Sequence, residues 1–375
     1  MKLHSVLGDT PIATFLKKYW QKKPLLIRQA IPDVRPPLSP EDLFSLAAQD
    51  HVESRLLTNV NDRWSLQHGP FHALPSRRKQ GWTLLVQGLN LHHDQAADLL
   101  HQFRFIPDAR LDDLMISYAT DGGGVGAHFD SYDVFLLQVH GQRRWRISAQ
   151  TDLGLKPGLP LKILAHFTPD EEYLLEPGDM LYLPPHYAHE GTAVGECMTC
   201  SIGFRAPSWE ELGQAFLEFK AETLELPGRY SDPGLSPSRH PAKIDDHLLD
   251  RVEHQLKKIR ATRDDVAVFI GEYLSEPKPG IFFDAPEEPL TLAKFRGSAI
   301  QAGLRLHRKT KMLYRGTYVF INGDSFRASA ADRGLLRQLA DQRRLPGGML
   351  ATASKDLLES LLQWYEDGWV VEGSS

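Results

Sequence analysis

The chain has 375 residues, of which 42% are hydrophobic and 24% are charged, and its net charge is -5. This length is sufficient for a sizeable core and for two or three domains, and the composition is ordinary for a globular protein. A dedicated DNA-binding protein would usually be basic, so direct DNA binding is not expected.

Neither a secretion signal nor a membrane span is expected. The segment MKLHSVLGDTPIATFLKKYW has no continuous apolar stretch and no small-residue cleavage site, and no stretch reaches the roughly eighteen apolar residues of a span. Cys197 and Cys200 form a C-x-x-C pattern, which also occurs in redox and zinc sites. They lie in the strand-like segment ECMTCSIGF, where an odd offset points side chains to opposite faces. Two packed thiols and a cytoplasmic location are therefore expected.

Residues 1–110 combine helical and short extended patterns. The segment DTPIATFLKKYW predicts a helix that is capped by Asp9 or Thr10, with Pro11 in its first turn. The segment SPEDLFSLAAQ predicts a second helix, capped by Ser39 and carrying acidic residues in its first turn. The segment DQAADLLHQF predicts a third.

The pattern changes between residues 113 and 204, where short strands follow one another. Turn signals such as DGGG, HGQ and EPGD separate them, and no amphipathic helix interrupts them. This pattern favours an antiparallel sandwich or barrel over a parallel sheet. The predicted strands are DLMISYA, YDVFLLQV, RRWRIS, EYLLE, MLYLP and CMTCSIGF.

After Pro207 the chain is again helical, beginning with SWEELGQAFLEFKAETLEL. Residues 228–242 are rich in Pro, Ser and Arg and predict a linker or extended loop, and helical patterns resume over 245–275. The segment MLYRGTYVFINGDSFRAS predicts paired strands with a tight turn at Asn322–Gly323. Two amphipathic helices and GWVVEG complete what is typical of a small winged-helix-like domain.

The glycine-rich segment GGGVGAHFD permits two interpretations. Gly122, Gly124 and Ala127 satisfy the G-x-G-x-x-[GA] pattern of dinucleotide-binding loops. That fingerprint requires a helix immediately afterwards, whereas the following HFDSYDVFLLQV is β-rich. Close backbone approach beside a site, or a strand bend, explains these glycines better.

The second interpretation of this segment is a metal site. On a strand, His128 and Asp130 would project from the same face, and His186 or His189 could supply a third ligand. Two histidines and one carboxylate form the facial triad of non-haem iron(II) oxygenases, which leaves positions open for a co-substrate and dioxygen.

Strand alternation adds independent support for a site. Arg143 shares a face with the apolar Trp145 and Ile147, and a buried arginine needs an anionic partner. A bound 2-oxoglutarate carboxylate and a structural Arg–Asp or Arg–Glu bridge remain equal alternatives on spacing alone. Two strands also have a small, polar face opposite a bulky one, which predicts a ligand cavity. The small faces carry Asp113, Met115, Ser117 and Ala119, and Cys197, Thr199, Ser201 and Gly203.

The chain resembles the JmjC-type 2-oxoglutarate oxygenases and, within them, the bacterial ribosomal oxygenases (RoxA type). The resemblance implies an α+β fold with a double-stranded β-helix core (cupin, jelly-roll or JmjC) and flanking helices. It further implies a JmjC catalytic domain at 1–206, a helical dimerisation region at 207–280 and a small C-terminal winged-helix-like domain at 281–375. It rests on FLKKYWQKKPLLIR, RLDDLMISYATDGGGVGAHFDSYDVFLLQVHGQRRWRI, LEPGDMLYLPPHYAHEG and SIGFRAP.

The resemblance also assigns roles to single residues. It implies that His128, Asp130 and His189 bind iron(II), with His189 rather than His186 as the third ligand. Arg143, assisted by Ser117 and Thr199, would bind 2-oxoglutarate. The substrate contacts would be Asp113, Tyr132 and Ser201.

The implied function is a cytoplasmic, homodimeric protein hydroxylase that uses iron(II), 2-oxoglutarate and dioxygen on an arginine of the large-subunit ribosomal protein uL16. Two alternatives remain open. The same chemistry could act on another protein residue, a tRNA base or a small molecule, or the chain could be a non-enzymatic metal-binding cupin. Asp113 favours a cationic substrate.

Overall fold

The computed structural model describes residues 6–60, 63–159 and 161–373. The chain divides into two compact units, with the first boundary between Ala206 and Pro207. The first unit also includes residues 279–283 and 307–309, and the second contains the rest of the chain. The division of this second unit into a dimerisation region at 207–280 and a winged-helix-like domain at 281–375 stays a prediction. No helix of the described residues is both long enough and apolar enough to span a bilayer.

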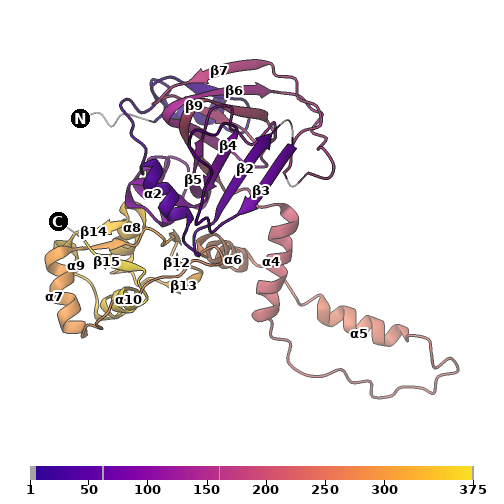
Figure 1. Cartoon of the computed structure of the whole chain (residues 1–375). Coiled ribbons are helices and arrows are strands. Elements are labelled where there is room, and N and C mark those ends of the chain that lie inside the picture. The colour runs from indigo at the N-terminus through magenta and orange to yellow at the C-terminus, as the bar shows by residue number, and fades with distance from the viewer. Residues whose placement is uncertain (1–5, 61–62, 160, 374–375) are drawn as a thin grey trace. The chain divides into compact units, whose positions relative to one another are not determined.

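In its described residues, the first unit is an antiparallel sheet with three α-helices, all from the N-terminal half of the unit (Figure 1). In chain order its elements are α1 (Ile12–Lys18), β1 (Leu25–Ile27), α2 (Pro40–Ala47), β2 (Ser54–Val60), β3 (Arg63–His68), β4 (Trp82–Val86), η1 (Leu89–Leu91), α3 (Asp94–His101), β5 (Leu111–Ala119), β6 (Val134–Ser148), β7 (Glu171–Leu175), β8 (Met180–Leu183) and β9 (Ala188–Phe204). Ser39 caps α2 as predicted, because its hydroxyl accepts a hydrogen bond from the Asp42 N–H at 3.1 Å. The cap predicted for α1 is wrong: Pro11 is the N-cap, and no side chain caps that helix.

The strands of this sheet run in the order β1-β8-β6-β9-β5-β4-β2-β3, with β7 beside β6. All of these pairs are antiparallel, as the turn-separated strand pattern predicted. In Figure 1, β3, β2, β4 and β5 lie side by side, and β6, β7 and β9 form the layer drawn above them. The long strand β9 connects the two layers, because it pairs with β5 along one half and with β6 along its whole length.

Two predictions about strand limits are wrong. The segments YDVFLLQV and RRWRIS were expected to be separate strands with a turn at HGQ, but they form the single strand β6. Its register shifts twice, between Gln138 and His140 and between His140 and Gln142, so the extra residues form a bulge rather than a turn. His128 and Asp130 lie outside the named strands, where His128 forms an isolated bridge with His189.

The alternation of faces is as predicted. Leu114, Ile116 and Tyr118 of β5 and Met198, Ile202 and Phe204 of β9 are buried in the main apolar core. Cys200 lies in that core, whereas Cys197 packs with Ala119 and Ala193 on the other side, and both cysteines are free and buried. The two thiols are therefore packed on opposite faces, and the C-x-x-C pattern forms no redox pair or zinc site in this structure.

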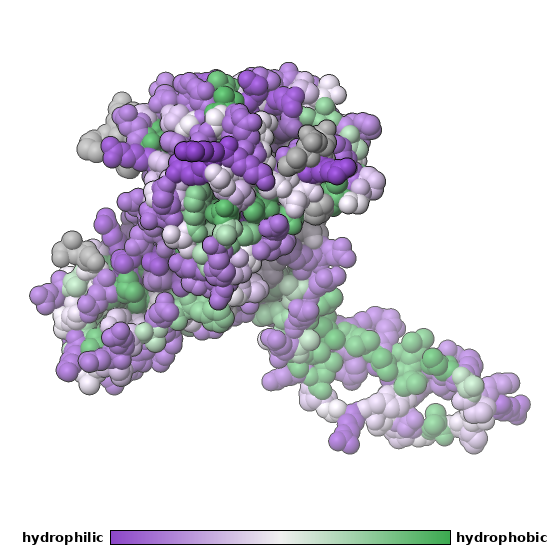
Figure 2. Space-filling view, in the orientation of Figure 1, coloured by the Kyte–Doolittle hydropathy of each residue, from purple (hydrophilic) through white to green (hydrophobic). Residues whose placement is uncertain are grey.

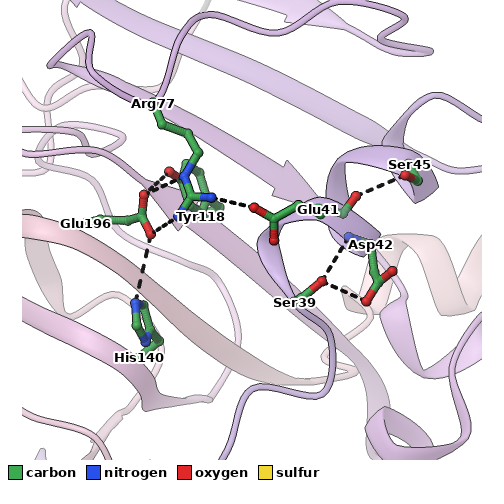
Figure 3. A network of polar contacts seen from close by, with 8 residues as sticks. All are labelled: Ser39, Glu41, Asp42, Ser45, Arg77, Tyr118, His140 and Glu196. Carbon is green, nitrogen blue, oxygen red and sulfur yellow. Dashed lines mark hydrogen bonds and ion pairs between the residues drawn. The ribbon is translucent and has the colours of Figure 1, made fainter.

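A polar network joins the end of β5 and the middle of β9 to α2 (Figure 3). Arg77 contacts Glu196 at 2.6 Å and Glu41 at 2.5 Å, and the Tyr118 hydroxyl donates to Glu196. The hydrogen bonds from Arg77 hold the pKa of Glu196 below its usual range. Arg77 and Glu41 are exposed, so their ion pair contributes little to stability.

The second unit consists of short helices and two small sheets. Its elements are α4 (Trp209–Glu222), α5 (Asp246–Leu256), α6 (Arg263–Ser275), α7 (Leu292–Ala302), β10 (Leu304–Leu306), β11 (Met312–Arg315), β12 (Tyr318–Ile321), β13 (Asp324–Arg327), α8 (Arg333–Gln342), β14 (Arg344–Leu345), α9 (Gly347–Leu350), α10 (Lys355–Glu366) and β15 (Val370–Glu372). The predicted turn at Asn322–Gly323 joins β12 and β13, with a positive φ at both residues as a type I′ turn requires. The core formed by α7, α8, α10 and the short strands is independent of the first unit.

Helices α4 and α5 have no buried residue at all. Residues 228–242, predicted to be a linker or extended loop, contain neither helix nor strand. Apolar side chains cover much of the surface of α4 and of α5 (Figure 2). They include Trp209, Leu217, Leu249 and Leu256.

Candidate active site

A cavity of about 290 Å³ opens inside the sheet of the first unit. Its walls are formed by the faces that carry small, polar side chains, as the alternation in β5 and β9 predicted. All nine residues singled out in the sequence line this one cavity: Asp113, Ser117, His128, Asp130, Tyr132, Arg143, His189, Thr199 and Ser201.

The cavity is lined by a cluster of two imidazoles and one carboxylate. One possible ligand atom from each of His128, Asp130 and His189 lies within 4.8 Å of the others. The His189 Nε2 atom is 3.7 Å from Asp130 Oδ2, and the two imidazole rings are 4.2 Å apart. The strand predicted at His128–Asp130 is reduced to one bridge, but that bridge pairs His128 directly with His189. The backbone N–H of each donates to the carbonyl of the other, at 2.9 and 2.8 Å.

Backbone carbonyls orient both imidazoles. The Nδ1 atom of His128 is 2.9 Å from the Gly126 carbonyl, and that of His189 is 2.8 Å from the Tyr187 carbonyl. A carbonyl can only accept, so each Nδ1 carries a proton, and in the neutral ring the lone pair is then on Nε2. Burial, with His128 nearby, lowers the pKa of His189 to about 4. The neutral ring with its lone pair on Nε2 is the form that binds a metal ion.

His186 and two nearby carboxylates, the other potential ligands in this region, are directed elsewhere. His186 is exposed, packs at a tilt against Phe129 and is not part of the cluster. Glu190 forms an ion pair with Arg146, and Asp133 accepts a hydrogen bond from Tyr182 at 2.6 Å. Within the described residues, the cluster therefore has three protein ligands and no fourth.

Arg143 is buried at one end of the cavity. Only 3% of the residue is exposed, yet it forms no ion pair with any carboxylate of the described residues. Its Nη1 donates to Ser117 at 3.0 Å and to Thr199 at 3.4 Å, its Nη2 donates to the Gly191 carbonyl, and its Nε has no acceptor. The structural Arg–Asp or Arg–Glu bridge is thus excluded among the described residues, and this cation is available for an anionic ligand.

Two neighbours fix the surroundings of this guanidinium. The Thr199 hydroxyl donates to Gln138 Oε1 at 2.8 Å, so its lone pairs face Arg143. Gly191 lies against Arg143, because a Cβ at that position would be 2.7 Å from the guanidinium Nε and 2.7 Å from the Trp145 ring. Only glycine leaves room for Arg143 at this position.

Asp113 lies at the opposite end of the cavity and is 5% exposed. Its Oδ2 accepts hydrogen bonds from Gln87 Nε2 at 2.5 Å and from the Gly88 N–H at 3.1 Å. The register of β5 shifts between Leu111 and Leu114, and this bulge carries Asp113. Ser201 is half-buried beside it on β9, and Tyr132 is 41% exposed at the mouth.

The glycine-rich segment passes between two strands. A Cβ on Gly123 would be 2.5 Å from the Trp82 carbonyl, and a Cβ on Gly124 would be 2.5 Å from the Gly191 carbonyl. Among the described residues, the next element after this glycine-rich segment is the strand β6, not a helix. The predicted close backbone approach therefore explains these glycines, and a dinucleotide fingerprint does not.

Sequence reasoning missed three polar residues that support the site. Gln138 orients Thr199, while Gln87 and Arg55 lie behind Asp113. Gln87 follows the fully buried strand β4, and a polar residue at the end of such a strand was the available signal. The partners of all three come from distant segments, so spacing along the chain does not reveal them.

Comparisons with known proteins agree with this geometry. Residues 98–212 match the JmjC domain family, and residues 255–370 match the family of ROXA-like winged helices. The chain is 34% identical to ribosomal protein uL16 3-hydroxylase of Escherichia coli, over 96% of this chain and 97% of that protein. It is 30% identical to a probable ribosomal oxygenase of Haemophilus influenzae, over 95% of each.

The structure is similar to a solved complex of the ribosomal oxygenase YcfD from Escherichia coli with cobalt and 2-oxoglutarate. The TM-score is 0.83 at 32% identity, and the match covers 97% of this chain and 98% of YcfD. These findings confirm the predicted JmjC resemblance, the cupin core and the C-terminal winged helix. The chain therefore belongs to the ribosomal oxygenase family.

Proposed function

We propose that this protein is an iron(II)- and 2-oxoglutarate-dependent hydroxylase in which His128, Asp130 and His189 hold the metal. The observation that carries the proposal is one cavity with both a three-ligand cluster and a buried arginine that lacks an anion. Two imidazoles and one carboxylate suit non-haem iron(II) and leave coordination positions open. A structural metal would require a closed ligand set, for which the described residues provide no fourth group.

Arg143 is the residue that would bind the co-substrate. A guanidinium forms two parallel hydrogen bonds with a carboxylate, and its burial makes that charge pairing stronger than in water. Ser117 and Thr199 would hold the guanidinium in place by accepting hydrogen bonds from its Nη1. When bound, the metal, 2-oxoglutarate and dioxygen supply the oxidising chemistry, so that one oxygen atom enters the substrate while succinate and carbon dioxide form. The protein positions the reactants and excludes water.

The proposed substrate is an arginine side chain of ribosomal protein uL16, which would place the enzyme in the cytoplasm. The Escherichia coli relative is named a uL16 3-hydroxylase. In this chain, Asp113 offers a buried carboxylate at the far end of the cavity, with Ser201 and Tyr132 beside it. A carboxylate there would pair with a guanidinium and place an aliphatic carbon of the same side chain near the metal.

The proposal is tested by incubating the protein with iron(II), 2-oxoglutarate and an arginine-containing fragment of uL16, followed by mass spectrometry of the peptide. The expected result is one added oxygen atom on the arginine. If succinate forms while the peptide stays unmodified, the chemistry is right and the substrate is another protein residue, a tRNA base or a small molecule. If neither product forms with iron bound, the non-enzymatic metal-binding module becomes the better explanation.

We also propose that α4 and α5 form the interface of a homodimer. Helix α5 has eleven residues and no buried side chain, and a helix of that length is marginal without packing. Its apolar residues Leu248, Leu249, Val252 and Leu256 are exposed in the single chain. A second copy would offer the same apolar surface, as a two-fold interface requires. Light scattering should give a dimer for the parent and a monomer for Leu256→Glu, with Leu155→Glu as the exposed-leucine control.

A further inference from the structure

We propose that Gln87 and Arg55 are positioning residues that hold the Asp113 carboxylate ready for a cationic side chain. This inference rests on the proposed function, because it concerns how the same cavity recognises an arginine. The three side chains come from different strands or strand ends: Arg55 from β2, Gln87 from the end of β4 and Asp113 from β5. All three line the cavity.

A chain of hydrogen bonds links these side chains in a single direction. Arg55 Nη2 donates to Gln87 Oε1 at 2.9 Å, and Gln87 Nε2 donates to Asp113 Oδ2 at 2.5 Å. The Gly88 N–H donates to the same carboxylate oxygen at 3.1 Å. Asp113 therefore receives two neutral donors on one oxygen, which stabilise its charged form in a buried position.

Arg55 determines which way the Gln87 amide faces. A glutamine amide can rotate by half a turn and exchange its oxygen and nitrogen. A guanidinium has only donors, so the amide oxygen must face Arg55, and the NH2 group must then face Asp113. In the other orientation the amide oxygen would lie against the carboxylate, and two acceptors would repel each other.

The amide also keeps the two opposite charges apart. Arg55 forms no ion pair with Asp113 or with any other carboxylate of the described residues, and its Nε is buried without an acceptor. A direct Arg55–Asp113 pair would neutralise this end of the cavity. With Gln87 between them, Arg55 orients the carboxylate without occupying the place of a substrate cation.

The space beside Asp113 is suited to such a cation. A Cβ built on Gly203 would lie 3.5 Å from Asp113 Oδ1 and 3.9 Å from the Tyr132 ring. Asp113 Oδ1 and the Tyr132 ring thus lie near the same part of the cavity wall, beside Gly203. A planar guanidinium in the cavity beside these groups would meet a carboxylate and an aromatic ring.

The test measures binding of two peptides without dioxygen, by fluorescence anisotropy, to protein loaded with manganese and 2-oxoglutarate. One is the uL16 peptide and the other carries citrulline, the neutral analogue, in place of the arginine. For the parent, the arginine peptide should bind more tightly. Gln87→Leu should weaken arginine-peptide binding about tenfold, as expected for a lost hydrogen bond to a charged group, and leave citrulline-peptide binding within about twofold.

The Arg55 variants distinguish orientation from simple packing. Arg55→Met should weaken arginine-peptide binding severalfold. Arg55→Lys should restore binding, because lysine can still donate to Gln87 Oε1. The double variant Arg55→Met with Gln87→Leu should bind the arginine peptide as Gln87→Leu alone does. The matched control is Gln80→Leu, which removes an exposed glutamine-to-aspartate hydrogen bond to Asp121 and should change neither peptide's binding. Melting curves establish that each variant is folded.

Three results would overturn the inference. Full discrimination between the peptides in Gln87→Leu would show that the amide does not position Asp113. Additive effects of the two substitutions would show that Arg55 does not act through Gln87. If the parent itself does not distinguish the peptides, the arginine substrate of the proposed function is wrong, and the positioning role fails with it.

Discussion

The two ends of the cavity carry side chains of opposite charge, and these side chains differ in how completely they are hydrogen-bonded. Arg143 is as deeply buried as Asp113, but its partners are two hydroxyls and one carbonyl, and its Nε has no acceptor. Asp113 has two N–H donors on a single oxygen and a third side chain that orients one of them. The cation at one end is incompletely satisfied, whereas the anion at the other end is well supported.

This difference indicates how each end would recognise its ligand. A buried cation without an anion costs free energy, and a carboxylate ligand that enters removes that cost on binding. If Arg143 binds 2-oxoglutarate as proposed, its incomplete hydrogen bonding would increase the affinity for that ligand. At the Asp113 end, the carboxylate already accepts two hydrogen bonds, so the proposed recognition would depend on its direction and on the shape of the cavity beside it.

The largest effect is expected from the residues between the two ends. His189→Ala removes a ligand whose free Nε2 faces the cluster, so turnover of 2-oxoglutarate should fall by more than about 100-fold. Succinate formation measures this, and metal content is read separately. His186→Asn is the control, because His186 is exposed and has a positive φ that asparagine tolerates. Equal losses in both variants would contradict the assignment of His189.

Arg143→Met should separate the two ends. Loss of two charged hydrogen bonds should weaken 2-oxoglutarate binding about 100-fold, measured by calorimetry, while anaerobic binding of the uL16 peptide changes little. Because the unpaired buried charge is gone, the free energy of unfolding of the ligand-free protein should rise. Arg144→Met is the matched control on the exposed face of the same strand. A loss of ligand-free stability in Arg143→Met would show that Arg143 is structural.

Two alanine substitutions should act on opposite ends. Gly191→Ala places a Cβ 2.7 Å from Arg143 Nε and should weaken 2-oxoglutarate binding about tenfold by displacing the guanidinium. Gly203→Ala meets only ordinary contacts within the protein but fills the gap beside Asp113, so it should weaken peptide binding instead. Calorimetry with each ligand tests the pair. If either variant affects both ligands equally, the two ends are not independent.

The smallest effects are expected from the hydroxyls around Arg143. Ser117→Ala removes an acceptor at 3.0 Å and should weaken 2-oxoglutarate binding about fivefold, as for a neutral hydrogen bond of about 1 kcal/mol. Thr199→Val removes a contact at 3.4 Å and should have a smaller effect. The same titration ranks them, and the reverse order would mean that Thr199 contacts the ligand directly.

Local pattern was sufficient to predict the strands of the core and the direction of their side chains. Alternation in β5, β6 and β9 placed Ser117, Arg143 and Thr199 on the cavity side, because β5 pairs regularly with β9 around Ser117 and Thr199, and β6 pairs regularly with β9 from Gln142 onward. It failed where the backbone is irregular. The β6 bulge looks like a turn in sequence, and His128 is held by a single bridge to a residue 61 positions away.

The supporting residues could not be predicted for a different reason. Gln87 and Arg55 owe their roles to the pairing of β4 with β2 and β5, which sets residues far apart in the chain side by side. Gln138 acts through a hydroxyl on a neighbouring strand. Residue type and spacing identify groups that can bind a metal or a charge, but the hydrogen bonds that orient those groups depend on the register of the folded sheet.

The backbone pairing of His128 with His189 bears on how the protein responds to iron shortage. The carbonyls of Gly126 and Tyr187 and the paired N–H groups hold the two imidazoles in place through the sheet itself. A zinc finger, in contrast, unfolds when its metal is withdrawn. This chain would stay folded while empty and regain activity as soon as iron returns, so iron supply would set its activity and leave its abundance unchanged.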